Sequence, residues 1–349
     1  MSLLRGPGRA RSFVRFAFAV AWLAASYFLA EKAAHGFTRG AAFPLIRNLF
    51  EIFLLVIGYS YMEIAWDDAR DPIRAMGLVA RPGAAGEFAL GAALGWGMVT
   101  VVFLVIVLGG TFYVQFANSS WAWGRLVVQI FVLASASLAA EIAFRGYPFQ
   151  QLVRAIGPFT ATVLAGVFFG LLRLATPGST PAAVWISAVA AVVLSVAYLR
   201  TYALWVCWGL HFTWLASMGI LFGQPIAGSR QASSVVRSYV DGPTWLTGSE
   251  YGPEASLITL LVLWIGLYVL IRITRDLAWK YTRPEPVFIP MPPLQPAPRA
   301  SIEQASRDPL VHGITAAPSE PHPQPRSEHA SEITPTVLPT GPLDRPPDR

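Results

Sequence analysis

Four ionisable side chains lie inside apolar stretches of this 349-residue sequence: Glu141, Arg145, Arg173 and His211. An ionisable group in the centre of a bilayer costs roughly 2.5–3.5 kcal/mol on insertion scales, so each of the four is a candidate for function. A carboxylate or an imidazole can exchange protons, whereas a guanidinium stays protonated and can only bind or stabilise an anion. The four side chains therefore have the groups needed either for acid–base chemistry or for a buried ion-pair cluster.

Spacing separates these alternatives only in part. Glu141 and Arg145 stand four residues apart, which puts both on one helix face with Glu before Arg, the favourable order for an ion pair. His211 is the only histidine in an apolar stretch, in the aromatic segment Trp208–Leu215. A single histidine without Cys, His or carboxylate partners at ligand spacing makes a poor metal site, so no metal and no cofactor are expected.

The elements that carry these residues are transmembrane helices. Hydrophobic residues make up 54% of the chain and charged residues only 13%, against roughly 25% charged in a soluble domain. The apolar stretches are long enough for a helix to cross a hydrocarbon core about 30 Å thick. Eight spans are predicted, at Phe13–Ala30, Asn48–Trp66, Phe88–Gly110, Leu126–Phe144, Pro158–Leu174, Ala182–Leu199, Tyr202–Phe222 and Ala255–Ile273. The predicted fold class is an all-α, polytopic bundle of about eight helices.

The distribution of basic residues predicts the orientation of the bundle. Most Arg and Lys fall on the side that also holds both termini, so both termini are expected in the cytoplasm. Residues 1–12 form a basic cytoplasmic N-terminus, and Phe13–Ala30 reads as a retained anchor because it is longer than the apolar core of a signal peptide. Residues 281–349 are rich in proline and poor in apolar periodicity, which predicts a disordered cytoplasmic tail.

Charge and cysteine content exclude other classes. The net charge of +6 is spread over short loops and not clustered, so nucleic-acid binding is not expected and membrane lipids are the expected surroundings. The single cysteine, Cys207, can form neither an intrachain disulfide nor a cysteine metal site, and it is expected to be a buried apolar residue. Glu51 and Glu63, near the ends of the second span, are expected to reach solvent at the interface.

Three segments resemble a known family. Ala140-Glu141-Ile142-Ala143-Phe144-Arg145-Gly146 is similar to a Glu-Glu-x-x-x-Arg motif closed by Phe-Arg-Gly, Phe169–Arg173 to a Phe-x-x-x-His motif, and His211–Leu215 to a His-x-x-x-Asn motif. This order on separate helices resembles the CAAX-protease and bacteriocin-processing (CPBP) family of intramembrane glutamic peptidases. The resemblance covers about residues 43–275 and implies a CPBP-like membrane domain over about 13–280.

The departures from the family pattern fall on the residues that would do the chemistry. The resemblance implies that the first Glu, helped by the His of the second motif, activates water, and that the His and Asn of the third motif support the oxyanion. This sequence has Ala140, Arg173 and Leu215 at three of those positions and keeps only Glu141, Arg145 and His211. Glu141 is about 100° around the helix from position 140, so its carboxylate is expected to point toward Arg145.

The resulting hypothesis is a CPBP homologue that has lost its proteolytic centre and acts in binding or scaffolding in a bacterial cytoplasmic membrane. Its expected partner is a membrane-anchored protein or peptide. Arg173 is expected to pair with Glu141, and all four buried ionisable groups are expected to share one polar cavity. Two alternatives stay open: an active but divergent intramembrane endopeptidase, and a small-molecule transporter, which the lack of internal repeats disfavours.

Overall fold

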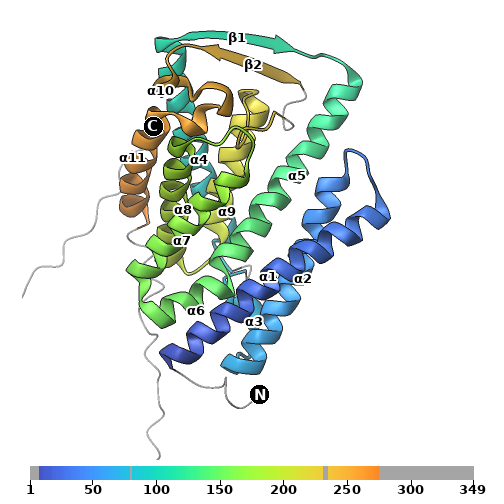
Figure 1. Ribbon diagram of the computed structural model, residues 1–349, viewed down its shortest axis with the longest axis vertical. Helices are drawn as coiled ribbons and strands as arrows, with labels where there is room; N and C mark the ends of the chain where they lie inside the picture. Colours follow the sequence, from blue (N-terminus) through green and yellow to red (C-terminus); the bar gives the residue numbers. More distant parts are fainter. Residues whose placement is uncertain (1–7, 79–80, 231–234, 275–349) are drawn as a thin grey trace, which may run out of the picture. The chain divides into compact units, whose positions relative to one another are not determined.

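The computed structural model describes residues 8–78, 81–230 and 235–274, and these form an α-helical bundle (Figure 1). The predicted tail, 281–349, and most of the basic N-terminus lie outside the described residues. The long and medium helices are α1 (Arg9–Phe37), α2 (Phe43–Asp67), α4 (Ala84–Gly109), α5 (Ser120–Arg145), α6 (Tyr147–Ile156), α7 (Pro158–Leu172), α8 (Pro181–Thr201), α9 (Trp205–Ala216) and α11 (Leu257–Ile273). Short helical turns are α3 (Pro72–Ala75), η2 (Arg173–Ala175), η3 (Ser217–Leu221), α10 (Thr244–Thr247), η4 (Ser249–Tyr251) and η5 (Pro253–Ala255).

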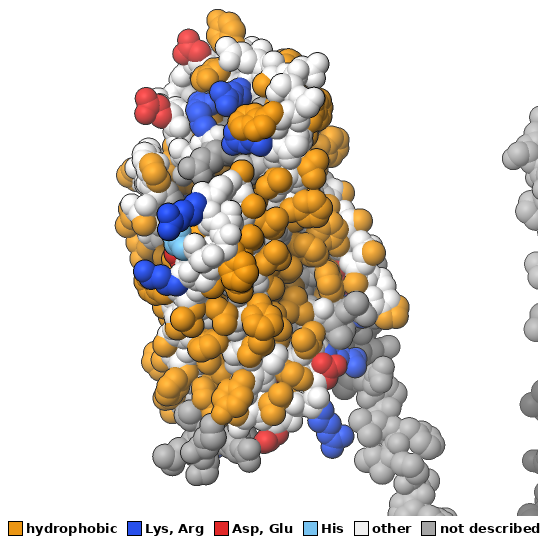
Figure 2. Space-filling model, turned by 90° about the vertical axis from the view of Figure 1, so that its right-hand side faces the viewer, with side chains coloured by type: hydrophobic (Ala, Val, Ile, Leu, Met, Phe, Trp, Pro, Cys, Tyr) orange, Lys and Arg blue, Asp and Glu red, His pale blue; other side chains and the backbone are white. Residues whose placement is uncertain are grey.

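Among the described residues, six helical segments are long and apolar enough to cross a membrane, which confirms the multi-pass helical fold. They correspond to the first six predicted spans, with α5 and α6 counted as one segment from Ser120 to Ile156. The seventh and eighth predicted spans are shorter apolar helices, Trp205–Leu221 and Leu257–Ile273. Figure 2 shows a broad belt of hydrophobic side chains on one face of the molecule, with most charged side chains near its ends or edges. An apolar outer belt is the surface that hydrocarbon requires.

Local sequence signals explain where several of these helices begin. Ser119, Thr180 and Ser256 each accept a hydrogen bond from the backbone N–H three residues on, as N-caps of α5, α8 and α11. Pro158 and Pro181 occupy the first turns of α7 and α8, where a missing N–H costs nothing. The caps and prolines therefore fix the first turns of the helices that carry the candidate site.

A two-stranded ribbon closes one end of the bundle and was not predicted. Strand β1 (Thr111–Phe116) pairs antiparallel with β2 (Val236–Asp241), in the register Thr111 opposite Asp241 and Phe116 opposite Val236. Neither segment was among the predicted elements, because six residues give little periodicity of their own. The ribbon connects the segment after α4 to the segment before α11 (Figure 1).

Glycines allow two helix pairs to approach closely. On α4, a Cβ at Gly91 or Gly95 would collide with backbone carbonyls of α9, and Gly209 meets α4 in the same way from the other side. Thr213 of α9 also donates its hydroxyl to the Ala92 carbonyl, at 2.9 Å. Small residues at such contacts are what lets transmembrane helices pack backbone to backbone. This contact fixes α9, the helix that carries His211.

The second glycine contact fixes α7 on α8. A Cβ at Gly166 would lie 3.0 Å from the Ala188 carbonyl oxygen, and one at Gly170 would lie 2.7 Å from the Val184 carbonyl oxygen. The end of α7, where Arg173 follows, is thereby held against the first half of α8.

A charge cluster ties α1, α2 and α6 together at the opposite end from the ribbon. Asp67 Oδ1 accepts from Arg15 at 2.7 Å and from Arg154 at 2.8 Å, while its Oδ2 accepts from Tyr147 at 3.1 Å and Gln151 at 2.9 Å. Because its carboxylate accepts from four donors, Asp67 connects the helix pair α1–α2 to α6.

Glu63 departs from its expected place. It lies one turn before Asp67 and is only 1% exposed, with no hydrogen bond to Oε1 among the described residues. The prediction that Glu63 reaches solvent is therefore wrong, because the face of α2 that carries it turns toward the charge cluster and not toward the interface.

We expect Asp67→Asn to lower the stability of the purified chain in detergent. The change leaves the Arg15 guanidinium, 2% exposed, without its counter-charge, and breaking a buried pair in this way costs roughly 3–5 kcal/mol. Thermal unfolding should show a drop of several degrees for Asp67→Asn and almost none for the control Asp68→Asn, whose side chain is exposed. Equal melting temperatures for the two variants would contradict the role of Asp67.

Reporter fusions test the predicted orientation. A fusion at residue 280 should report the cytoplasm and one at Gly242, beyond β2, the opposite side, since an odd number of predicted spans separates them. The same side for both would overturn the prediction of eight spans.

Candidate functional site

The centre of the site is the carboxylate of Glu141 in the last turns of α5. Its Oε1 lies 2.6 Å from His211 Nδ1 on α9 and 3.3 Å from Arg145 Nη1 one turn on. Glu141 is completely buried and Arg145 is 1% exposed. The predicted Glu–Arg pair therefore exists, and the structure adds His211 as a second partner of the same oxygen.

The same cluster reaches a third helix. Arg145 Nη2 donates to the Ala191 carbonyl of α8 at 3.1 Å, so one ion pair connects α5, α8 and α9. The arginine also lies 5.8 Å from the centre of the Phe169 ring, within cation–π distance. The attraction in a buried charge pair offsets the cost of desolvation fully only when the remaining polar atoms are also hydrogen-bonded, and two here are not. Glu141 Oε2 and Arg145 Nε have no hydrogen-bond partner among the described residues.

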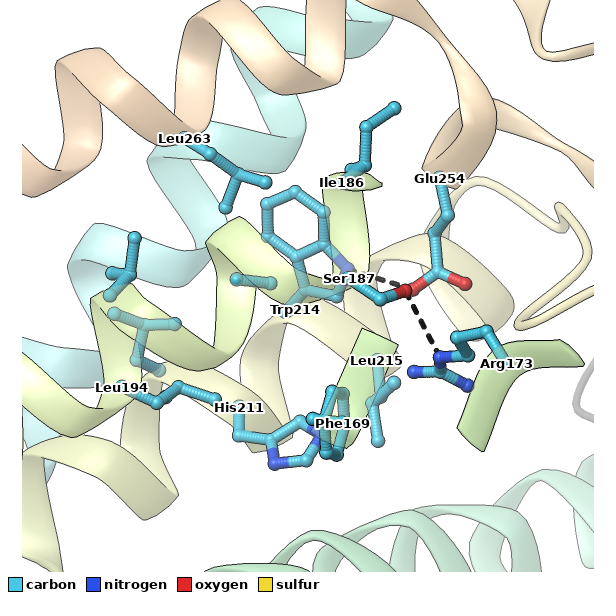
Figure 3. A pocket seen from close by; sticks show the side chains of 13 residues that line it. Phe169, Arg173, Ile186, Ser187, Leu194, His211, Trp214, Leu215, Glu254 and Leu263 are labelled. Atoms are coloured by element: carbon cyan, nitrogen blue, oxygen red, sulfur yellow. Dashed lines mark hydrogen bonds between the residues drawn. The ribbon is translucent and has the colours of Figure 1, made fainter. Parts of the chain in front are cut away.

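A small cavity lies beside this cluster, between α7, α8, α9 and η5 (Figure 3). Its lining is mostly apolar with a few polar groups, and we call it the polar cavity because those groups include two charged side chains. Its volume is about 40 Å³, room for a few water molecules. The polar residues that line it are Arg173, Ser187, His211, Trp214 and Glu254. Glu141 and Arg145 are not among the lining residues, so His211 separates the buried carboxylate from the cavity.

Arg173 does not occupy its predicted place. Its Nε donates to the Ser187 hydroxyl at 3.1 Å, and its guanidinium carbon lies 5.2 Å from the centre of the Phe169 ring. Among the described residues no carboxylate lies within ion-pair distance of Arg173. The prediction that Arg173 pairs with Glu141 is wrong, because α7 ends at Leu172 and the guanidinium turns toward α8, where the Ser187 hydroxyl is within reach.

The four predicted residues therefore divide into two groups. Glu141, Arg145 and His211 form one buried network. Of these three, only His211 also lines the cavity that Arg173 lines. Leu215, the degenerate third-motif position, lines the cavity beside Arg173 (Figure 3). Ala140 does not line it. The prediction that all four residues share one polar cavity is therefore wrong. The structure has a buried ion cluster with a small cavity next to it.

Glu254 is a cavity residue that was not among the predicted site residues. Its Oε1 accepts from the Trp214 indole at 3.1 Å and its Oε2 from the Ala227 backbone N–H at 2.6 Å. Nearby, the hydroxyls of Tyr251 and Thr176 are 3.3 Å apart, and burial raises the pKa of Tyr251, which therefore stays protonated at neutral pH. The available signal was a carboxylate just before the last apolar span, in Gly252-Pro253-Glu254.

The candidate metal ligands are sparse. Within residues 8–78, 81–230 and 235–274, no three His, Cys, Asp or Glu side chains are grouped so that they could hold a metal ion. Cys207 is fully buried, and its thiol donates to the Leu194 carbonyl at 3.3 Å.

Fold and site together define a multi-pass helical membrane protein with a buried Glu–Arg–His cluster at the junction of three helices. Residues 120–217 match the family model described as Rce1-like, type II CAAX prenyl endopeptidase Rce1-like. This segment, which contains all three motifs, is similar to the CPBP family, and the predicted resemblance is confirmed over these residues. The matched segment is shorter than the predicted 43–275. No curated protein and no solved structure matches the chain.

We expect Glu141→Gln to destabilise the bundle. The change leaves Arg145 buried without a counter-charge, and the loss of one partner of such a pair costs roughly 3–5 kcal/mol. Thermal unfolding in detergent should show a large decrease for Glu141→Gln, and Glu250→Gln, at an exposed position, should unfold like the parent. A Glu141→Gln variant as stable as the parent would contradict the structural role of the carboxylate.

Proposed function

We propose that this CPBP-type membrane protein binds a membrane-anchored protein or peptide without cleaving it. Its setting under this proposal is a bacterial cytoplasmic membrane, with both termini in the cytoplasm. The observation that carries the proposal is the composition of the polar cavity. A guanidinium and an aliphatic side chain, Arg173 and Leu215, line it at the positions where the family mechanism needs an imidazole and an amide.

The retained carboxylate is badly placed to replace the missing base. A general base must lie within hydrogen-bond reach of the water that it activates. Glu141 has no exposed surface, does not line the cavity, and already shares Oε1 with His211 and Arg145. Ala140, one residue earlier, has no proton-accepting group. The arrangement supports a carboxylate that holds helices together.

The loss of catalytic groups at these positions has a large effect on the rate of peptide cleavage. A general base contributes roughly 10²–10⁴-fold and an oxyanion donor about 10²–10³-fold, and groups that act as a unit fail together. Arg173 cannot serve as a base because a guanidinium stays protonated, although it can attract an anionic group of a partner. A binding role therefore fits the cavity better than turnover does.

An active but divergent endopeptidase is the second candidate, and two observations favour it. Glu141 Oε2 has no hydrogen-bond partner among the described residues, which leaves an acceptor for a water molecule. Glu254 is a carboxylate on the wall of the same cavity as His211. Both of its oxygens already accept hydrogen bonds, from Trp214 and Ala227, so a role as base would use their remaining lone pairs.

A peptidase assay separates the two candidates. We expect the purified parent chain in detergent or vesicles to cleave neither a peptide library nor a farnesylated peptide. The triple variant Ala140→Glu, Arg173→His, Leu215→Asn restores the family constellation and is the form in which cleavage is expected to appear. The matched control is the double variant Arg173→His, Leu215→Asn, which lacks the base.

The opposite result is equally clear. Cleavage by the parent chain that disappears in Glu141→Gln or Glu254→Gln, with the variant still folded, would show an active enzyme. It would also identify which of the two carboxylates is the base.

A further inference from the structure

An apolar groove runs between α1, α5, α6 and α7 and shares no lining residue with the polar cavity. Its volume is about 640 Å³, within the roughly 300–1,000 Å³ typical of small-molecule sites. All the residues that line it are apolar, among them Phe13, Val20, Leu152, Leu164 and Phe168. Leu164 and Phe168 are about half exposed, so the groove opens sideways on the surface that faces the hydrocarbon.

One end of this groove meets a hollow of different chemistry. The hollow, which we call the basic hollow, is lined by Gly8, Arg9, Ser12, Arg15, Trp66, Asp67, Asp68 and Arg154. On α1, Arg9 precedes the groove residue Phe13 by four positions, about 6 Å along the helix. On α6, Arg154 precedes the groove residue Ile156 by two positions. The apolar groove therefore ends within about one helical turn of the basic hollow on both helices.

The charges of the basic hollow favour an anion. Three guanidiniums face two carboxylates, and Asp67 already accepts from both Arg15 and Arg154. Arg15 also donates to the Trp66 carbonyl at 2.9 Å and is 2% exposed, so the donors for an anion come from the exposed guanidinium of Arg9 and from Arg154, each with five N–H groups. Arg9 is exposed and Arg154 is 46% exposed, which places positive charge where the headgroup layer would lie. Arginine forks match the geometry of phosphate oxygens.

From this juxtaposition we infer that the groove binds one acyl chain of an anionic phospholipid, with the lipid phosphate on the basic hollow. The two halves of the site match the two halves of such a lipid: hydrocarbon along α1 and α7, and a negative headgroup at Arg9 and Arg154. A zwitterionic lipid would fill the groove equally well but would gain less from the arginines. The bound lipid would fasten α1 to α6 and α7, an inference independent of the proposed function.

Native mass spectrometry of the full-length chain in detergent tests this inference. The delipidated protein is titrated with phosphatidylglycerol and, separately, with phosphatidylcholine of the same acyl chains. We expect phosphatidylglycerol to bind about fivefold more tightly, because it carries a net negative charge, whereas the choline cation of phosphatidylcholine offsets the charge of its phosphate. Arg9→Gln should reduce that preference without changing the affinity for phosphatidylcholine.

A groove-filling variant tests the acyl-chain half of the site. Ala17 lines the groove and is exposed, so Ala17→Trp should keep the fold and weaken binding of both lipids about tenfold. The control is Val14→Trp, on the same helix, 41% exposed and outside the groove, and it should bind like the parent. Ala165→Phe fills the same groove from α7 if Ala17→Trp proves unstable.

Three outcomes would overturn the inference. Equal affinity of the parent for the two lipids would mean that the arginines do not select a headgroup. Unchanged binding by folded Ala17→Trp or Ala165→Phe would mean that the acyl chain lies elsewhere. Displacement of phosphatidylglycerol by stoichiometric farnesylated peptide would assign the groove to an isoprenyl chain.

Discussion

The structure depends on one buried charge, the carboxylate of Glu141. It has no exposed surface, and its compensation comes from Arg145 on the same helix and His211 on α9. A carboxylate alone in such a place would be very costly, so these partners must be present whenever the bundle is folded. Because Arg145 also donates to the Ala191 carbonyl of α8, the requirement fixes three helices relative to one another.

The helix contacts around this charge determine the rest of the site. Glycine contacts hold α9 on α4 and α7 on α8, so His211 faces both the buried carboxylate and the small cavity. The cavity itself presents Arg173, hydrogen-bonded to Ser187, and the engaged carboxylate Glu254. The retained motif residues Glu141, Arg145 and His211 thus bond to one another, while Arg173 lines the cavity at the position where the resemblance implies a histidine. This separation is the physical reason to propose binding without turnover.

Much of this could be predicted from the sequence, and the exceptions have identifiable causes. Apolar run length gave the six long spans, and helical spacing gave the Glu141–Arg145 pair, because both are local properties of the chain. The partners of His211, Arg173 and Glu254 depend on which helices meet and on where each helix ends, and periodicity does not encode that. For this reason Arg173 donates to a hydroxyl on α8 and does not pair with Glu141. Glu63 is buried because a charge cluster from three separate segments lies beside it.

The most direct test of the account is a double-mutant cycle between Glu141 and Arg145, measured as unfolding free energy in detergent. The cycle uses Glu141→Gln, Arg145→Met and the double variant. If the two residues compensate each other's buried charge, the double variant should be more stable than the sum of the single losses predicts, by about 1–3 kcal/mol. Strictly additive losses would contradict the account, because they would mean that the bundle does not depend on this pair.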